Sequence, residues 1–241
     1  MHCLLRLLFF WLLLTPVPGL AEQRAVATNV GGSIGRPDIR VGDQWKYRVT
    51  DKFTRLTHSV SVEVMSVTEN RIQTRNLESA LDAASLPAAA GVIGVWDRDW
   101  NPLSHGTIEY KPFYPVLQFP LEPGKQWSGT VQWYGGSGTL RHQLTAQVAG
   151  WERVTVPAGS FDALRITVRG NISETGSINY YSQSGSIANV TWYAPAIGQI
   201  VKKEVDHSDN TPIGLGRLSE RWELVEYKPN GASFGKSRPA R

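Results

Sequence analysis

The sequence predicts an all-β fold, a single strongly curved antiparallel sheet in the form of a half-barrel, a barrel or a sandwich, with little helix. Apolar and polar residues alternate with a period of two along most of the chain. This alternation is typical of strands with one buried and one solvated face. Clusters of Pro, Gly, Asn and Asp separate the runs, as turns do. One-sided burial favours antiparallel over parallel pairing.

The first residues carry the pattern of a secretory signal. Arg6 precedes an unbroken apolar run at positions 7–14, and small residues, Gly19 and Ala21, occupy the third and first positions before the expected cut. The apolar run is too short to span a bilayer. We therefore expect residues 1–21 to be a signal peptide that is cleaved after Ala21. The mature protein is expected in the periplasm or outside the cell, without a transmembrane segment.

Composition restricts the chemistry of the mature chain. The single cysteine, Cys3, lies inside the signal, so neither disulfides nor thiolate metal sites are expected. The histidine spacings do not match a metal-binding helix, and we expect no metal and no cofactor. The net charge of the whole chain is +4, which is too mild to indicate a nucleic-acid partner.

Three regions follow the signal. Residues 22–40 are rich in Gly, Ser and Asn without periodicity, which predicts a flexible arm. Residues 41–227 contain the alternating runs and form the expected antiparallel β domain. Residues 228–241 are expected to be a basic, disordered tail. Within the domain, only 77–90 departs from alternation. Its Ala and Leu content allows one or two helical turns, which Pro87 limits.

Each expected strand rests on its own alternating run, bounded by turn residues. In chain order the runs are 45–50, 60–64, 127–133, 140–148, 154–156, 164–169, 191–194, 199–205 and 217–227. The segment Val154–Gly170 is expected to be a hairpin in which Pro157 and Gly159 form a three-residue loop, with positive φ at Gly159. Val154 and Val156 are expected to share a face with Leu164.

Three motifs resemble those of a family of exported bacterial proteins known only as a domain of unknown function. They are VPAGSFDA at Val156–Ala163, WYAPAIG at Trp192–Gly198, and FPLEPGKQW at Phe119–Trp127. Their order and spacing extend the resemblance over roughly residues 41–227. The resemblance implies an all-β protein located in the cell envelope. It implies no substrate, catalytic residue or ligand.

Candidate catalytic patterns have simpler structural interpretations. The sequence at 31–35 matches Gly-x-Ser-x-Gly, but it lies in the arm without a preceding strand or a following helix. Asp97 and Asp99 are interpreted as turn residues with an arginine partner. His142, on the apolar side of its run, is interpreted as a satisfied core or rim histidine. We expect no catalytic residue; whether the protein is an enzyme stays open, and these patterns favour a non-enzyme.

Aromatic residues are the strongest functional signal, because a sheet protein can line a concave ligand site with them. The segment 96–119 is the least regular part of the domain and contains several prolines. Irregular segments on β scaffolds often carry binding sites. The expected ligand-binding residues, with the tryptophans as the floor of the main pocket, are Tyr110, Phe113, Tyr114, Trp127 and Trp133.

These observations favour a non-catalytic binder or carrier of an apolar or amphiphilic ligand. Candidate partners are a lipid, a glycan or an envelope protein. One alternative is a structural or assembly factor of the envelope, which an exposed apolar patch would favour. A second alternative is a hydrolase, which would need a histidine, an acid and a nucleophile brought together by folding.

Overall fold

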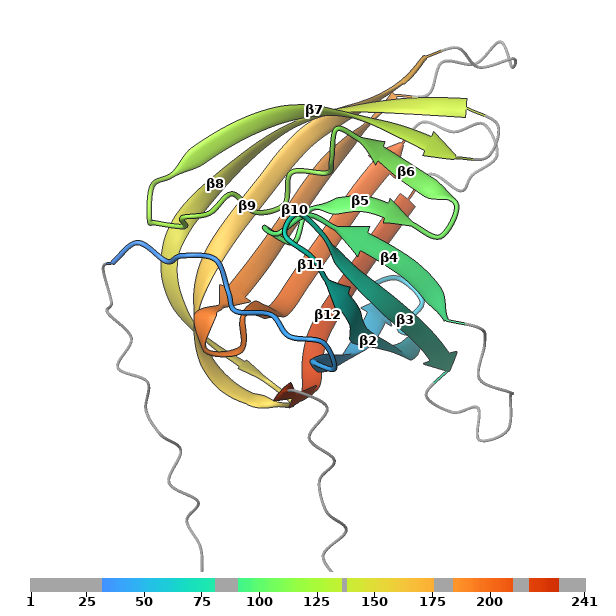
Figure 1. Cartoon of the computed structure of the whole chain (residues 1–241). Helices are drawn as coiled ribbons and strands as arrows, with labels where there is room; N and C mark the ends of the chain where they lie inside the picture. Colours follow the sequence, from blue (N-terminus) through green and yellow to red (C-terminus); the bar gives the residue numbers. More distant parts are fainter. Residues whose placement is uncertain (1–31, 81–90, 136–137, 176–183, 210–216, 230–241) are drawn as a thin grey trace, which may run out of the picture.

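The computed structural model describes residues 32–80, 91–135, 138–175, 184–209 and 217–229, and these form an antiparallel β-barrel (Figure 1). The twelve strands within the described residues follow one another around the wall in chain order, and the first strand closes the barrel by pairing with the last. The predicted all-β fold is confirmed. Of the three forms left open by the sequence, the chain adopts the barrel.

The strands differ greatly in length. The first six are β1 (Gln44–Asp51), β2 (Thr57–Val67), β3 (Ile72–Ala80), β4 (Val92–Trp96), β5 (Pro102–His105) and β6 (Ile108–Lys111). The second six are β7 (Gln126–Gly135), β8 (Gly138–Val156), β9 (Gly159–Thr175), β10 (Ser184–Ala194), β11 (Gln199–Asp209) and β12 (Arg217–Lys228). Within the described ranges the only helical element is the single 3₁₀ turn η1 (Pro195–Ile197). The same ranges contain no helix that is long and apolar enough to cross a membrane.

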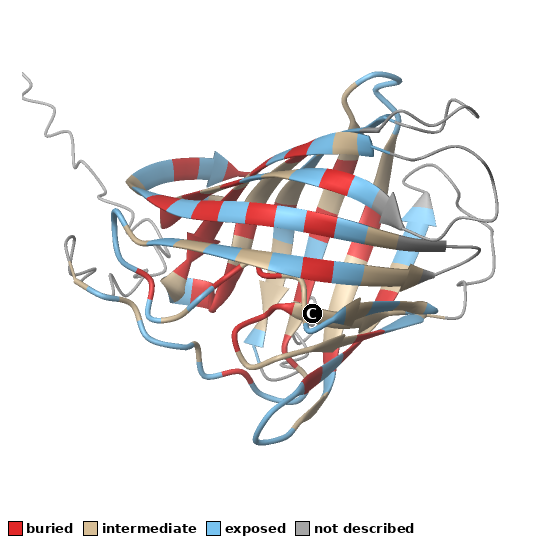
Figure 2. Cartoon of the chain, turned by 90° about the horizontal axis from the view of Figure 1, so that it is seen from above, coloured by how far each residue is buried: buried red, intermediate tan, exposed pale blue. Residues whose placement is uncertain are grey.

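Alternation along the strands places one set of side chains inside the barrel, and Figure 2 shows buried and exposed positions following each other along the wall. On β8, Leu144 and Ala146 are buried, whereas Gln143 and Thr145 are exposed. The strand pattern expected from the sequence therefore corresponds to an inner apolar face and an outer polar face.

The connection between β6 and β7, residues 112–125, contributes to the core. Leu117 and Leu121 are 1% and 0% exposed. The buried side chain of Asn101 fixes this connection: its Oδ1 accepts hydrogen bonds from the backbone of Val116 and Leu117, at 2.7 and 2.8 Å. Its Nδ2 donates to the carbonyl oxygen of Leu117 at 2.9 Å. Since 112–125 contains no strand, this amide replaces the pairing that a sheet would provide.

The turn before β5 forms as expected, but its arginine partner differs. Asp97 Oδ1 accepts hydrogen bonds from the backbone of Asp99 and Asn101, both at 2.8 Å. The guanidinium that pairs with Asp99 is that of Arg36, from the segment before β1, and not that of the adjacent Arg98.

Residues 32–40 lie against the barrel. Ile34 pairs with Leu121 as an isolated β-bridge, and Ile39 is 5% exposed. The described part of the expected arm is therefore held by specific contacts. The expected signal peptide, residues 22–31 of the arm and residues 230–241 of the tail lie outside the described residues.

The segment expected to allow helical turns is divided. Residues 77–80 belong to β3, which runs as strand to Ala80. The remaining positions of that expectation, 81–90, lie outside the described residues.

The β8–β9 hairpin departs from the expected geometry in two details. Pro157 and Ala158 form a two-residue turn rather than a three-residue loop, although Gly159 does adopt a positive φ of 132°. The expectation that Val154 shares a face with Leu164 is wrong. Val154 pairs with Phe161, and Leu164 pairs with Trp151.

The two-residue turn causes this difference, since both pairs lie between the turn and the nearest register shift, and a three-residue loop would pair Val156 with Ser160 instead. A β-bulge between Val148 and Gly150 separately adds one residue to β8, which places Val154 and Val156 on the opposite face from Val148. Val154 and Val156 are nevertheless only 6% and 5% exposed. The tip of the hairpin lies against β12, because the Ala158 N–H donates to the carbonyl oxygen of Leu224 at 3.0 Å.

Candidate functional site

Three of the five predicted aromatic residues are linked by pairing or ring contact, namely Tyr110, Tyr114 and Trp133, whereas Trp127 lies six positions before Trp133 on β7, roughly 20 Å along the strand. Tyr110 on β6 is the cross-strand partner of Trp133 on β7, and its ring contacts that of Tyr114 with centroids 5.8 Å apart. Trp127 Nε1 donates to the carbonyl oxygen of Pro115 at 3.3 Å. Phe113 lies in the same connection, partly buried. The irregular segment therefore does bring aromatic side chains against the wall.

His142 belongs to this cluster, and sequence reasoning did not include it. It lies on β8 opposite Val131 and Ile172, with 8% of its surface exposed. Its ring meets that of Tyr114 edge to face, with centroids 5.8 Å apart. The alternation already placed His142 on the inner face. The contact with Tyr114 could not be foreseen, because it depends on the path of residues 112–125.

Three polar atoms of this cluster are buried without a hydrogen-bond partner among the described residues. They are Nδ1 and Nε2 of His142 and Oη of Tyr114. The interpretation of His142 as a satisfied core histidine is therefore wrong with respect to its hydrogen bonds. Leaving a buried polar group unpaired costs roughly 1–3 kcal/mol, so these three atoms require a partner other than the described residues, and a water molecule or a ligand would each supply one.

The electrostatics of the cluster keep these groups neutral. Burial lowers the pKa of His142 from 6.5 to about 4, so at neutral pH its imidazole can donate one hydrogen bond and accept another. Burial also raises the pKa of Tyr114 and of Tyr110, so both phenols keep their protons. The cluster offers donors and acceptors without charge. No group of metal-binding side chains occurs in the described ranges.

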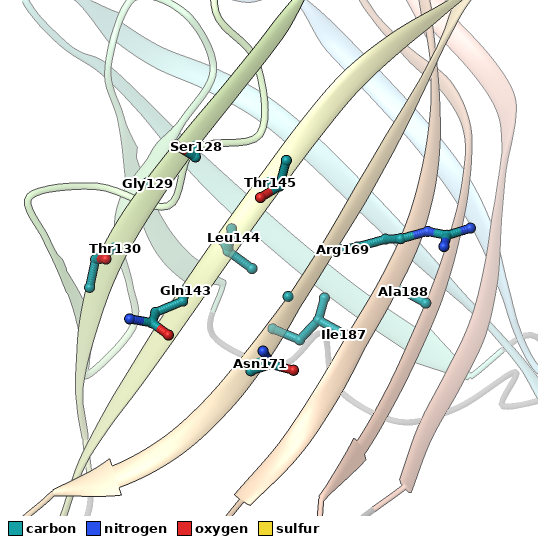
Figure 3. A pocket seen from close by; sticks show the side chains of 11 residues that line it. Ser128, Gly129, Thr130, Gln143, Leu144, Thr145, Arg169, Asn171, Ile187 and Ala188 are labelled. Carbon is teal, nitrogen blue, oxygen red and sulfur yellow. The ribbon is translucent and has the colours of Figure 1, made fainter.

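A separate hollow of about 610 Å³ lies over β7–β10 (Figure 3). Its lining residues are Ser128, Gly129, Thr130, Gln143, Leu144, Thr145, Arg169, Gly170, Asn171, Ile187 and Ala188. Gln143, Thr145, Arg169 and Asn171 are exposed polar side chains, so the hollow opens on the outer face of the wall. None of the five predicted site residues lines it, and it contains no histidine or carboxylate.

Two glycines in the lining of the hollow occupy closely packed positions of the wall. Gly129 and Gly170 both pair with Leu144, and they belong to the inner row of side chains. A Cβ at Gly170 would lie 2.2 Å from the carbonyl oxygen of Gln143, so no larger residue fits there. The polar groups of the hollow are accessible to water and need no ligand, in contrast to the buried atoms of His142 and Tyr114.

No protein-family model and no curated protein sequence matches the chain. Several solved structures are similar to it, of which three are described. One is a protein of Bacteroides fragilis whose description proposes export and a YmcC-like fold, with 16% identity, a TM-score of 0.47, and coverage of 82% of this chain and 100% of that one. These likenesses assign no function to this chain.

The other two structures are described in relation to lipoproteins. One is a protein of Parabacteroides distasonis proposed to be a lipoprotein, with 14% identity, a TM-score of 0.46, and coverage of 81% and 99%. The other is the hypothetical lipoprotein YmcC of Escherichia coli, with 12% identity, a TM-score of 0.43, and coverage of 78% and 85%. The geometry of the chain itself has to carry any functional conclusion.

Proposed function

We propose that the protein is a non-catalytic binder or carrier of an apolar or amphiphilic ligand, held inside the barrel beside Tyr110, Tyr114, Trp133 and His142. One observation carries this proposal: Tyr114 Oη and both ring nitrogens of His142 are buried without partners in the described structure. A hydrogen-bonding group on a ligand would restore the bonds that these atoms lack. The surrounding rings would contribute apolar area, at about 25 cal/mol per Å² buried.

A catalytic role is less well supported by the same geometry. A general base at neutral pH needs a pKa near that pH, whereas burial lowers the pKa of His142 to about 4. The cross-strand neighbours of His142 are Val131 and Ile172, and its ring partner is Tyr114. None of the three is a carboxylate that could orient the imidazole.

A structural or assembly role in the envelope is favoured by a different observation. Phe53 and Leu56, in the connection between β1 and β2, are 51% and 72% exposed. Exposed apolar side chains of this kind can contact a partner. Replacing both by Ser would weaken such a partner contact without affecting a ligand held beside His142, so the two functions can be separated.

The proposed location is the periplasm or the exterior of the cell, and its support is the signal pattern of residues 1–21. A lipid is the preferred ligand, because the inner cluster combines apolar rings with few polar atoms. No cofactor or nucleic acid is included in the proposal.

Binding of a neutral amphiphile tests the proposed function. The fluorescent dye N-phenyl-1-naphthylamine should bind the purified mature protein saturably, and oleyl alcohol should displace it. Tyr114→Phe should weaken oleyl alcohol roughly tenfold, about 1.4 kcal/mol, by removing one hydrogen bond. Tyr134→Phe is the control, since Tyr134 lies next to Trp133 on the opposite face of β7. If neither N-phenyl-1-naphthylamine nor oleyl alcohol binds saturably, the proposed function is excluded.

A further inference from the structure

A lysine on the inner face of the barrel extends the proposed site. Lys203 lies on β11 between Val201 and Val205, which are 0% and 4% exposed and belong to the interior. Its sequence neighbours, Lys202 and Glu204, form an ion pair with each other at 3.3 Å. Since side chains alternate along the regular part of the strand after Val201, Lys203 faces the interior with Val205, and its side chain is partly buried.

The surroundings of Lys203 are only partly polar. Its cross-strand partners are Thr191, which is 1% exposed, and Trp222. The Lys203 ammonium lies 5.7 Å from the centroid of the Trp222 ring. The nearest acid on that face, Glu220, accepts a hydrogen bond from Trp222 Nε1 at 2.8 Å. Among the described residues no carboxylate forms an ion pair with Lys203, whereas Lys52 and Lys202 are both paired.

An inward ammonium without an ion pair is costly. Burial lowers the pKa of Lys203, and the charge of Glu220 only partly opposes this effect. A buried charge is generally retained where a partner of opposite charge completes it. Because Glu220 is held by Trp222, an anion would be placed on the Thr191 side of Lys203, where the hydroxyl group can donate a hydrogen bond.

Lys203 and the aromatic cluster lie along one interior. Thr191 pairs with Ile166 on β9, and His142 pairs with Ile172 on the same strand. Six positions separate these two isoleucines, which corresponds to roughly 20 Å along a strand. A long molecule is therefore required to reach from one group to the other.

We propose that Lys203 binds the anionic head group of a long-chain amphiphile whose apolar part extends toward Tyr114 and His142. The inference rests on the proposed function and adds the ligand class, an amphiphile with a carboxylate or a phosphate head. The neutral atoms of His142 and Tyr114 then form hydrogen bonds with a polar substituent on the far part of the molecule. Lys203 supplies the preference for negative charge.

The experiment compares three single-chain amphiphiles as competitors of N-phenyl-1-naphthylamine: oleate, monooleyl phosphate and oleyl alcohol. Wild-type protein should bind at least one of the two anions tenfold or more tightly than the alcohol. The anion that binds more tightly, oleate or monooleyl phosphate, identifies the head group as carboxylate or phosphate. Equal affinity for all three would overturn the role of Lys203, while leaving the proposed function intact.

Two variants test whether Lys203 causes the preference for anionic amphiphiles. Lys203→Met should remove the preference for anions and leave oleyl alcohol binding unchanged, whereas Lys202→Met, on the outer face, should change neither. Unchanged anion preference in Lys203→Met would overturn the inference. If Lys203→Met does not fold, the comparison of anion and alcohol binding by the wild-type protein still tests the inference. Failure of all three amphiphiles to bind would instead remove the proposed function itself.

Discussion

The imidazole of His142 packs edge to face against the phenol ring of Tyr114, with an interplanar angle of 84° and ring centroids 5.8 Å apart. The two residues come from very different settings, one from the long strand β8 and the other from the irregular connection 112–125. Their contact closes a small region of the interior in which three polar atoms have no partner among the described residues.

Stability should fall as the pH is lowered from 6.5 towards 4. The pKa of His142 is 6.5 in its ordinary state and about 4 in the fold, so within this window the unfolded chain binds a proton that the folded protein does not. The free energy of unfolding should therefore decrease by up to about 1.4 kcal/mol per pH unit from this residue. Urea unfolding at pH 7, 5.5 and 4.5 measures the effect.

His142→Phe is the matched variant for this measurement, because it keeps an aromatic ring but cannot be protonated. Its pH dependence between 6.5 and 4 should be shallower than that of the wild type. The same slope in both proteins would show that other groups produce the acid sensitivity.

Asn101→Ala should be strongly destabilising. The side chain is 2% exposed and serves the backbone of Val116 and Leu117, so its loss leaves several buried groups unpaired. We expect a loss of about 3 kcal/mol or more in the free energy of unfolding, measured by urea denaturation. Asn70→Ala, at an exposed position between β2 and β3, should change stability by less than about 0.5 kcal/mol. Similar losses at both positions would contradict the role of Asn101.

Gly159→Ala should destabilise the protein by about 1 kcal/mol. At φ 132° the backbone of Gly159 lies in a region that side chains disfavour, although no atom lies within 4 Å of the added Cβ. Gly35→Ala provides the control, since it also has open space and has no positive φ. Because neither added Cβ meets another atom, the difference between the melting temperatures of the two variants measures backbone strain alone. A larger effect at Gly35 would be incompatible with this explanation.

Processing of the exported chain should remove residues 1–21. N-terminal sequencing of the protein recovered from the periplasm or the medium should then begin at Glu22. Recovery of the chain with Met1 in membranes, resistant to salt and alkaline washing, would contradict cleavage.

Local patterns of the chain account for most of the wall. The alternation of Trp45, Tyr47 and Val49 correctly predicts an inner face on β1, because alternation depends only on neighbouring residues. It could not reveal the bulge between Val148 and Gly150, which reverses the faces of Val154 and Val156. Nor could it choose between barrel and sandwich, since closure depends on pairing between the two ends of the domain.

The candidate site was predictable to a similar degree. The neighbourhood of Tyr110 and Trp133 follows from the order of strands, which places β6 beside β7. The approach of Tyr114 to His142 depends on a connection without strand pairing, held by the amide of Asn101. The inward direction of Lys203 is visible in the sequence only once Val201 and Val205 are known to be core residues.

The pairing of β1 with β12 joins Gln44 to Lys228, near the two limits of the domain. Loop closure between such distant positions carries a large entropic cost, and sheets with long-range pairing fold slowly. A chain that is synthesised or transported from its N-terminus therefore keeps two unpaired sheet edges until β12 emerges. The enclosed interior with His142 and Lys203 comes into existence only at that last step. A molecule bound inside would therefore be captured as the wall closes or admitted afterwards, and in neither case before β12 is present.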